Sequence, residues 1–400
     1  MPQPSDVVIA AYARTPFGRF GGVLADLSTA RLGAIAIDAV LDRTGLPPQA
    51  VEALYMGVGM IGAATLTPAR QAVLLSRLPE TTPSLAIDRA CCSGMSAIGI
   101  GWRDIRLGLA QAVICGGAEN LSATPHLLPR RRDRSIGAIA ADDPLAMRTP
   151  TVTTPIAAYT SREALGHGID RAAQDAWALA SHERYFTAEE AGYFVAERIP
   201  VTAPGPKGCT AEVTADEAPR RDTSLDRLAA LTTVHGSETI TAGNAPGLND
   251  GAAFVLLTSR GFAERHGLPV LATIAGYVQV ADGPTSGSYT PAIGIGKLLR
   301  TAGRGVGDLD LIEINEAFAA TPLVSTLRLA DGDRAAAERL RARTNAHGGA
   351  VAIGHPIGAS GARLAMTLVN GLRQRGGGTG AAAICGGYGQ GDALLVDVRA

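Results

Sequence analysis

Four short stretches of the chain carry side chains that can do chemistry at a carbonyl group. The first contains Cys91, which follows an apolar run ending at Ile87 and precedes a helical pattern. Unpaired backbone N–H groups and the positive end of a helix dipole stabilise a thiolate there, which predicts a lowered thiol pKa. Cys91 is therefore a candidate nucleophile. The alternative is a buried, inert cysteine.

The other three stretches lie in the last third of the sequence. Asn315 follows an apolar run, His355 closes a glycine-rich segment, and Cys385 ends a second apolar run before paired glycines. Taken singly, each has a structural interpretation: a capping amide, a core histidine, a buried thiol. Together with Cys91 they supply a nucleophile, a base that can polarise it, a second acid/base and a polar donor for an oxyanion.

Apolar runs and helix signals predict the elements that position these side chains. Uninterrupted apolar runs at residues 7–11 and 112–119 indicate buried strands. A helix is expected from an N-cap at Ser28 to Arg43, because Gly45 stops it. Strands that alternate with helices favour an α/β architecture.

Two segments far apart in the chain repeat each other. Residues 112–119 are Ala-Val-Ile-Cys-Gly-Gly-Ala-Glu, and residues 382–389 are Ala-Ala-Ile-Cys-Gly-Gly-Tyr-Gly. Each follows a predicted helix, and each helix follows a loop of small residues, which indicates two similar α/β halves. Residues 120–241 are richer in polar residues, proline and glycine, so we interpret them as an insertion carried by the first half. A basic patch in it is interpreted as a solvated or interface loop: Arg130, Arg131, Arg132 and Arg134.

Length, charge and cysteine usage exclude several classes of protein. The chain has 400 residues, more than one hydrophobic core supports, which predicts at least two packed units. A formal net charge of −1 argues against nucleic-acid or membrane partners. Five scattered cysteines form neither a disulfide framework nor a zinc motif, so we expect a cytoplasmic protein without a metal site. No apolar run approaches the roughly 20 residues of a membrane span.

One motif supports a different class of enzyme. After a predicted strand at residues 51–56, Gly57, Gly59 and Gly62 match the G-x-G-x-x-G spacing of dinucleotide-binding proteins. An NAD-dependent oxidoreductase is therefore the alternative function. That motif needs a helix that opens at the glycines, whereas proline places the helix start near Pro68, so the alternative is less favoured.

The sequence resembles the thiolase family, the acetyl-CoA acetyltransferases and 3-ketoacyl-CoA thiolases, over essentially its whole length. The matching segments in chain order are residues 13–18, 68–72, 116–122, 241–253, 315–318, 354–356 and 385–389. The resemblance implies an α/β fold of two similar βαβαβαββ halves that form a layered α/β/α/β/α core with an inserted loop domain. The implied limits are residues 1–120 and 245–275 for the first half, 121–244 for the loop domain and 276–400 for the second half.

The resemblance also implies a mechanism. Cys91 would accept the acyl group as a thioester, and His355 would take its proton. Cys385 would move the α-proton of the acetyl-CoA unit, and Asn315 would hold a water that stabilises the enolate oxygen together with His355. The N–H groups of Cys91 and Gly387 would form a second oxyanion hole. The implied reaction is reversible thiolytic cleavage of 3-ketoacyl-CoA or Claisen condensation with acetyl-CoA, as in fatty acid metabolism.

Coenzyme A and acyl-CoA enter this scheme as substrates, with no permanently bound cofactor. Arg220 matches a family residue at the nucleotide end of coenzyme A, and Ala245, Pro246 and Ile156 match positions along the pantetheine and acyl channel. A homodimer or homotetramer is the implied working form. A catalytically silent, thiolase-like protein is a further alternative, which the complete catalytic set disfavours.

Several positions depart from the usual family pattern. They are Cys92 after the nucleophile, Cys115, His347, Tyr388, Pro246 and the segment Pro155-Ile156-Ala157. Cys92 is interpreted as a small substitute and Cys115 as structural. The others would change the lining of the acyl or pantetheine channel. We therefore expect a preferred acyl chain other than the plain acetoacetyl unit.

Overall fold

The computed structural model describes residues 3, 5–60, 66–128, 141–147, 151–205 and 209–399. Its strands are β1 Val7–Arg14, β2 Gly18–Arg19, β3 Ala53–Gly57, β4 Ser84–Ile87, β5 Ala112–Asn120, β6 Val201–Pro204, β7 Thr210–Val213, β8 Asn249–Ser259, β9 Ala272–Ala281, β10 Leu311–Ile314, β11 Gly378–Gly386 and β12 Gln390–Val398. Its helices are α1 Thr29–Thr44, α2 Pro68–Leu75, α3 Ser93–Arg106, α4 Ile156–Gly166, α5 Arg171–Glu190, α6 Leu225–Ala229, α7 Arg260–Arg265, α8 Thr290–Ala302, α9 Ala320–Leu329, α10 Arg334–Arg341, α11 Ala350–Ile353 and α12 Ile357–Gln374. None of the described helices is long and apolar enough to cross a membrane.

Two halves of the main sheet share one strand topology. The sheet order is β10-β11-β12-β9-β1-β8-β5-β3-β4, with β2 paired to β8. In the first half, β3 and β5 are parallel, and β8 is antiparallel to both β5 and β1. The same pairings recur for β10, β11, β12 and β9 in the second half. β5 and β11 are the two segments that repeat in the sequence, so the predicted internal repeat is confirmed.

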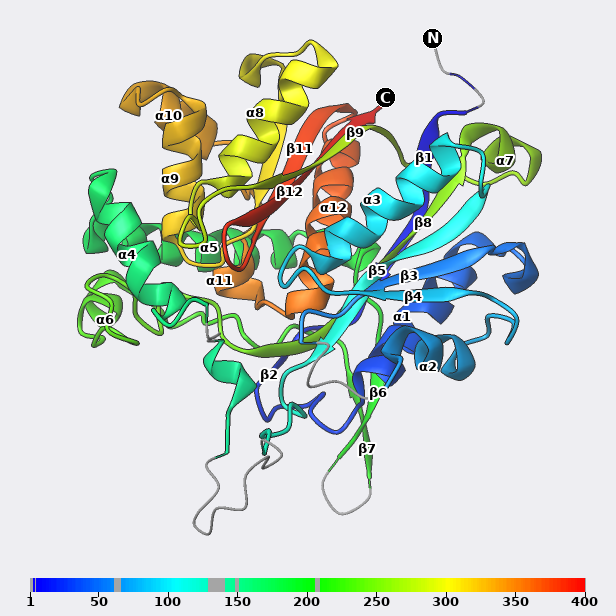
Figure 1. Ribbon diagram of the computed structural model, residues 1–400, viewed down its shortest axis with the longest axis horizontal. Helices are drawn as coiled ribbons and strands as arrows, with labels where there is room; N and C mark the ends of the chain where they lie inside the picture. The colour runs from blue at the N-terminus through cyan, green and yellow to red at the C-terminus, as the bar shows by residue number, and fades with distance from the viewer. Residues whose placement is uncertain are drawn as a thin grey trace.

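The helices form layers on either side of these strands. α3 and α12 lie side by side between the two halves, α1 and α2 cover the outer face of the first half, and α8 covers that of the second (Figure 1). Glycines allow α3 and α12 to touch: a Cβ on Gly94 would lie 2.4 Å from the Gly358 carbonyl oxygen, and one on Gly361 would lie 2.3 Å from the Met95 nitrogen. The predicted layered α/β fold is confirmed.

Local signals account for several element boundaries. The Ser28 side chain accepts a hydrogen bond from the Arg31 N–H at 3.2 Å and caps α1, and Gly45 ends that helix with φ 63°. α2 begins at Pro68, as predicted. β1 continues to Arg14, past the apolar run, because it stays paired with β8.

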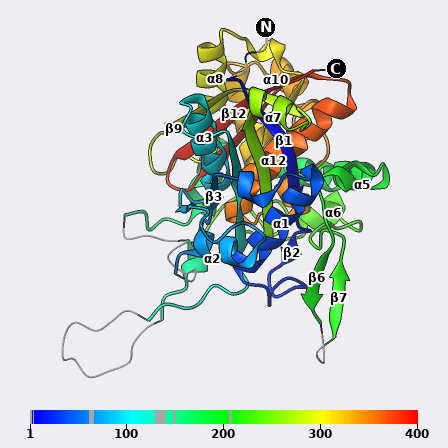
Figure 2. The same cartoon turned by 90° about the vertical axis from the view of Figure 1, so that its right-hand side faces the viewer.

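The segment between β5 and β8 contains α4, α5, α6 and the β6–β7 hairpin, whereas a short turn joins β11 to β12. The hairpin lies at the end of the molecule opposite to the two chain termini (Figure 2). Buried ion pairs join Arg14 on β1 to Glu197 at 3.0 Å and to Asp216 at 2.7 Å, which ties this segment to the first half. The four arginines of the predicted basic patch lie outside the described residues.

Candidate active site

The side chains of Cys91, His355 and Asn315 meet where the two halves adjoin. The His355 Nε2 atom lies 3.2 Å from the Cys91 Sγ and 3.4 Å from the Asn315 Nδ2. Cys91 precedes α3, His355 precedes α12 and Asn315 follows β10, so the three come from the ends of different elements. His355 and Asn315 are buried, and Cys91 is partly exposed.

Hydrogen bonds to Ser360 and Asn249 orient the imidazole. The Ser360 hydroxyl donates to the Pro356 carbonyl at 2.8 Å, so its oxygen accepts the His355 Nδ1–H at 2.6 Å. This assignment leaves Nε2 as the unprotonated nitrogen that faces Cys91. The His355 backbone N–H donates to the Asn249 Oδ1 at 2.9 Å. Burial, with a smaller effect of Arg363, lowers the pKa of His355 to about 3, so the ring is neutral.

The Cys91 thiol differs from the sequence-based expectation. Burial, followed by the neighbouring Cys385 and Glu119, raises the pKa of Cys91 instead of lowering it. Cys91 stands one residue before Cys92, the N-cap of α3, and therefore outside the first helical turn where the dipole acts most strongly. The neutral imidazole also supplies no positive charge to stabilise a thiolate. At rest, a neutral thiol faces a neutral imidazole.

Cys385 and the turn after it lie against the nucleophile loop, residues 88–92, which joins β4 to α3 and contains Cys91. A Cβ on Gly386 would lie 2.8 Å from both the Arg89 carbonyl oxygen and the Cys92 Sγ. A Cβ on Gly387 would lie 3.7 Å from the Ala90 Cβ. Burial raises the pKa of Cys385 to about 12. The structure thus brings the second predicted acid/base, also in its protonated form, next to the nucleophile.

A buried carboxylate next to Asn315 fixes the loop that carries the amide. Glu316 accepts hydrogen bonds from four donors: the Trp177 Nε1 at 2.8 Å, the Ser181 hydroxyl at 2.9 Å, and the Asn345 Nδ2 and the Val351 N–H at 3.0 Å each. The Asn315 Oδ1 is buried and has no hydrogen-bond partner among the described residues. The Asn315 amide is therefore held in place with one acceptor still available.

The residues predicted to contact coenzyme A lie in three places. Ala245 and Pro246 are half-buried in the segment leading to Leu248, which forms a parallel bridge with His355. Ile156 opens α4 and is half-buried. Arg220 is exposed, and its backbone N–H donates to the His182 Nδ1 at 3.2 Å. Its guanidinium forms no ion pair within the described chain, unlike the neighbouring Arg221 and Arg227, which are paired with Glu190 and Asp222.

The glycines of the dinucleotide-binding alternative serve helix packing. A Cβ on Gly57 would lie 2.4 Å from the Gly94 nitrogen, and one on Gly59 would lie 2.2 Å from the Ile357 Cγ2. α2 begins only at Pro68, and Gly62 lies outside the described residues. Close approach of α3 and α12 thus explains the first two glycines, and the oxidoreductase alternative is not favoured.

Three further residues noted in the sequence pack against other parts of the chain. Cys92 is buried, with its Sγ 3.5 Å from the Ile384 carbonyl oxygen. Cys115 is buried against α3, where a Cβ on Gly101 would lie 2.4 Å from its Sγ. The His347 ring stacks on Tyr193 with centroids 3.8 Å apart.

Sequence reasoning missed Ser360 and Asn249, which orient His355. A weak signal for Ser360 was its place in the small-residue loop that follows His355, and one for Asn249 was the polar pair with Asp250 before an apolar strand.

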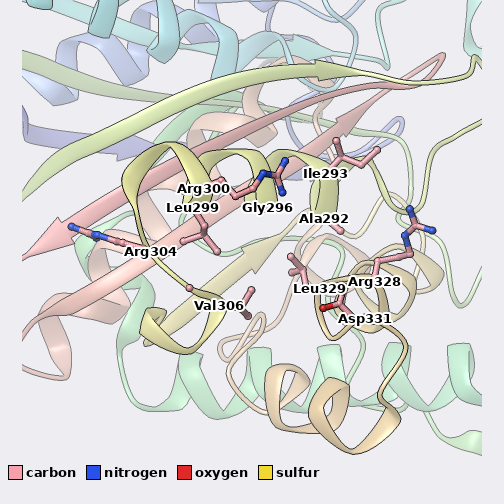
Figure 3. Close-up of a pocket in the computed structure, with 11 residues that line it drawn as sticks. Ala292, Ile293, Gly296, Leu299, Arg300, Arg304, Val306, Arg328, Leu329 and Asp331 are labelled. Atoms are coloured by element: carbon pink, nitrogen blue, oxygen red, sulfur yellow. The ribbon is translucent and has the colours of Figure 1, made fainter.

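A surface cavity of about 310 Å³ lies apart from these side chains. It is lined by α8, the loop after it and the end of α9, and the guanidinium groups of Arg300, Arg304 and Arg328 point away from one another (Figure 3). None of the catalytic candidates lines it. Groups of three or more possible metal ligands are absent from the described residues.

Known proteins match the chain along most of its length. The family described as "Thiolase, N-terminal domain" matches residues 7–261, and "Thiolase, C-terminal domain" matches residues 268–398. The acetyl-CoA acetyltransferase of Chromobacterium violaceum is 40% identical, covering 98% of this chain and 99% of that protein. The beta-ketoadipyl-CoA thiolase of Pseudomonas aeruginosa is 38% identical over the same shares.

Solved structures agree with these sequence matches. Human mitochondrial 3-ketoacyl-CoA thiolase superposes with a TM-score of 0.92 at 34% identity, covering 98% of this chain and 99% of that one. A structure of human mitochondrial 3-ketoacyl-CoA thiolase in complex with CoA superposes with a TM-score of 0.91 at 34% identity, over 100% of both chains.

Proposed function

The chain belongs to the thiolase family and is a CoA-dependent acyltransferase, and on that premise we propose that Cys91 carries the acyl group between two substrates. The observation that carries the proposal is the contact of 3.2 Å between the Cys91 Sγ and the unprotonated His355 Nε2. A base in hydrogen-bond contact with a thiol can take its proton as the nucleophile attacks.

In thiolysis, His355 takes the Cys91 proton and the sulfur attacks the C3 carbonyl of a 3-ketoacyl-CoA. The C2–C3 bond then breaks, the acyl group remains on Cys91 as a thioester, and the acetyl-CoA enolate takes a proton from Cys385. The coenzyme A thiol then gives its proton to Cys385 and attacks the thioester carbonyl. The shortened acyl-CoA leaves, and the released Cys91 sulfur takes back its proton from His355. Condensation is the reverse sequence. Both thiols start protonated, so charge on the two sulfurs and on His355 develops only during the reaction. At that stage the bound substrate excludes water from the site.

Backbone and amide donors stabilise the negative charge that develops. The N–H groups of Cys91 and Gly387 would hold the tetrahedral oxyanion on the acyl group, consistent with the Gly387 turn packing against the nucleophile loop. Asn315 would hold a water that, with His355, stabilises the enolate oxygen. The available Asn315 Oδ1 supports this role, because a water can donate to it.

Coenzyme A and acyl-CoA are the proposed substrates. Arg220 would pair with a phosphate at the nucleotide end, which suits an exposed guanidinium that forms no ion pair with the residues that the structure describes. Ala245, Pro246 and Ile156 would line the pantetheine and acyl channel, which the bridge between Leu248 and His355 supports for the first two. We propose a preferred acyl chain other than the plain acetoacetyl unit and a place in fatty acid metabolism. A cytoplasmic homodimer or homotetramer is the proposed working form.

Intact-protein and peptide mass spectrometry after incubation with acetyl-, acetoacetyl- and longer 3-ketoacyl-CoAs tests this function. The expected result is an acyl adduct on the Cys91 peptide, absent from Cys91→Ala and retained by Cys209→Ser, which removes an exposed cysteine. Acetoacetyl-CoA should not be the substrate that gives the fastest adduct formation. An unmodified Cys91 with every substrate would contradict the acyl-enzyme mechanism and favour a catalytically silent protein.

A further inference from the structure

A buried carboxylate outside the proposed catalytic set holds the nucleophile loop. Asp392 on β12 is 0% exposed and forms an ion pair with Arg89, two residues before Cys91. Its second oxygen accepts hydrogen bonds from the Ser96 hydroxyl at 2.6 Å and the Tyr277 hydroxyl at 2.5 Å. Both oxygens of the carboxylate therefore have partners, and one of these partners lies in the first turns of α3.

Arg89 also forms hydrogen bonds with other residues in and around the nucleophile loop. Its guanidinium also donates to the Ser96 hydroxyl at 3.0 Å and to the Gln390 Oε1 at 3.1 Å. Its backbone N–H donates to the Ser93 hydroxyl at 2.9 Å, which in turn donates to the Ala90 carbonyl at 2.5 Å. Ala90 has φ 49°, a left-handed conformation that costs an alanine free energy and needs such support.

The strand pair that contains Asp392 also contains the second proposed catalytic thiol, Cys385. Asp392 on β12 pairs with Ile384 on β11, and the next pair along the ladder joins Cys385 to Gly391. The ion pair between Arg89 and Asp392 therefore crosses from the first half to the second within two residues of Cys91 and one ladder step of Cys385. The two halves also approach closely beside this ion pair, since a Cβ on Gly386 would lie 2.8 Å from the Arg89 carbonyl oxygen.

We propose that Asp392, acting through Arg89 and Ser96, is a positioning residue that sets the separation of Cys91 from Cys385 and from the Gly387 N–H. The inference rests on the proposed roles of Cys91 and Cys385. Transfer of the α-proton needs Cys385 close to the group on Cys91, and the oxyanion needs both N–H groups at hydrogen-bond distance. The two thiols come from different halves of the fold, so a connection between the halves has to fix their spacing.

Steady-state thiolysis kinetics of Asp392→Asn test the proposal, because this substitution keeps the side-chain volume and removes the charge. Asp397→Asn is the matched control: it lies on the same strand and pairs with Arg304 at 2.6 and 2.7 Å, away from the site. We expect kcat of Asp392→Asn to fall at least tenfold, with KM for the 3-ketoacyl-CoA within threefold of wild type. The rate at which iodoacetamide alkylates Cys91 should stay within threefold of the wild-type rate, because this reaction needs neither Cys385 nor Gly387.

Tyr277→Phe and Ser96→Ala, each of which removes one hydrogen bond to Asp392, keep the test decisive if Asp392→Asn folds poorly. The proposal predicts that both variants lose kcat although their melting temperatures lie above the assay temperature, so that they are folded in the assay. It is overturned if folded Asp392→Asn, or both secondary variants, have kcat within twofold of Asp397→Asn. Failure of the proposed function gives a different result, since the wild-type protein would then form no acyl adduct on Cys91 and cleave no 3-ketoacyl-CoA.

Discussion

Replacing Ser360 with alanine tests whether one hydroxyl selects the catalytic tautomer of His355. Ser360 is 1% exposed and accepts the Nδ1–H at 2.6 Å, which leaves Nε2 free to accept the Cys91 proton. Without this hydroxyl, the tautomer that the mechanism needs carries a buried N–H without a partner, which costs about 1 to 3 kcal/mol. Since 1.4 kcal/mol is a factor of ten, the productive tautomer falls about 5- to 150-fold in population.

The assay is steady-state thiolysis with the preferred 3-ketoacyl-CoA. kcat of Ser360→Ala should fall by roughly 5- to 150-fold with KM nearly unchanged, because Ser360 is buried behind the His355 ring, to which it is hydrogen-bonded. The matched control is Ser325→Ala on α9, which removes another buried hydroxyl, one that donates to the Ser288 carbonyl at 2.7 Å. Equal kcat values for the two folded variants would refute the assignment of Nε2 as the unprotonated nitrogen.

Three other properties can be measured directly. The alkylation rate of Cys91 should rise about tenfold per pH unit and reach no plateau below pH 9. Burial raises the pKa of Cys91, and the thiolate fraction grows with pH at every pH below that pKa. A plateau of the rate near pH 6 to 7 would indicate a thiolate–imidazolium pair. Gly386→Ala should lower kcat at least tenfold, because the new Cβ would lie 2.8 Å from the Arg89 carbonyl oxygen. The control Gly307→Ala, whose Cβ would meet no atom within 4 Å, should leave kcat unchanged. Similar kcat values for the two variants would contradict the close approach of residues 386 and 89. Glu316→Gln should lower the free energy of unfolding, measured with denaturant, by about 2 to 4 kcal/mol, since four buried donors lose a charged acceptor. The control Glu338→Gln changes a side chain that is 68% exposed and should change this free energy by less than about 0.5 kcal/mol. An equally small effect at Glu316 would show that its charge is dispensable.

The amino-acid sequence alone determines the features that depend on neighbouring residues. Ser28 and Gly45 bound α1 and Pro68 opens α2, because capping groups and proline act within one helical turn. The repeated segments 112–119 and 382–389 indicate two similar halves, because similar local patterns form similar strands. The candidate catalytic residues could be named from residue type and from the family resemblance.

Only the tertiary structure decides the properties that depend on distant residues. The pKa of Cys91 is raised, not lowered, because the thiol is buried and a second thiol, Cys385 from the other half, lies nearby. Ser360 selects the His355 tautomer, and Arg89 meets Asp392 across 303 positions of the chain. Desolvation and long-range pairing have no local sequence signature, because they arise only when the two halves pack. The sequence therefore specifies the chemical groups of the site, and the packing of the two halves decides their protonation and spacing.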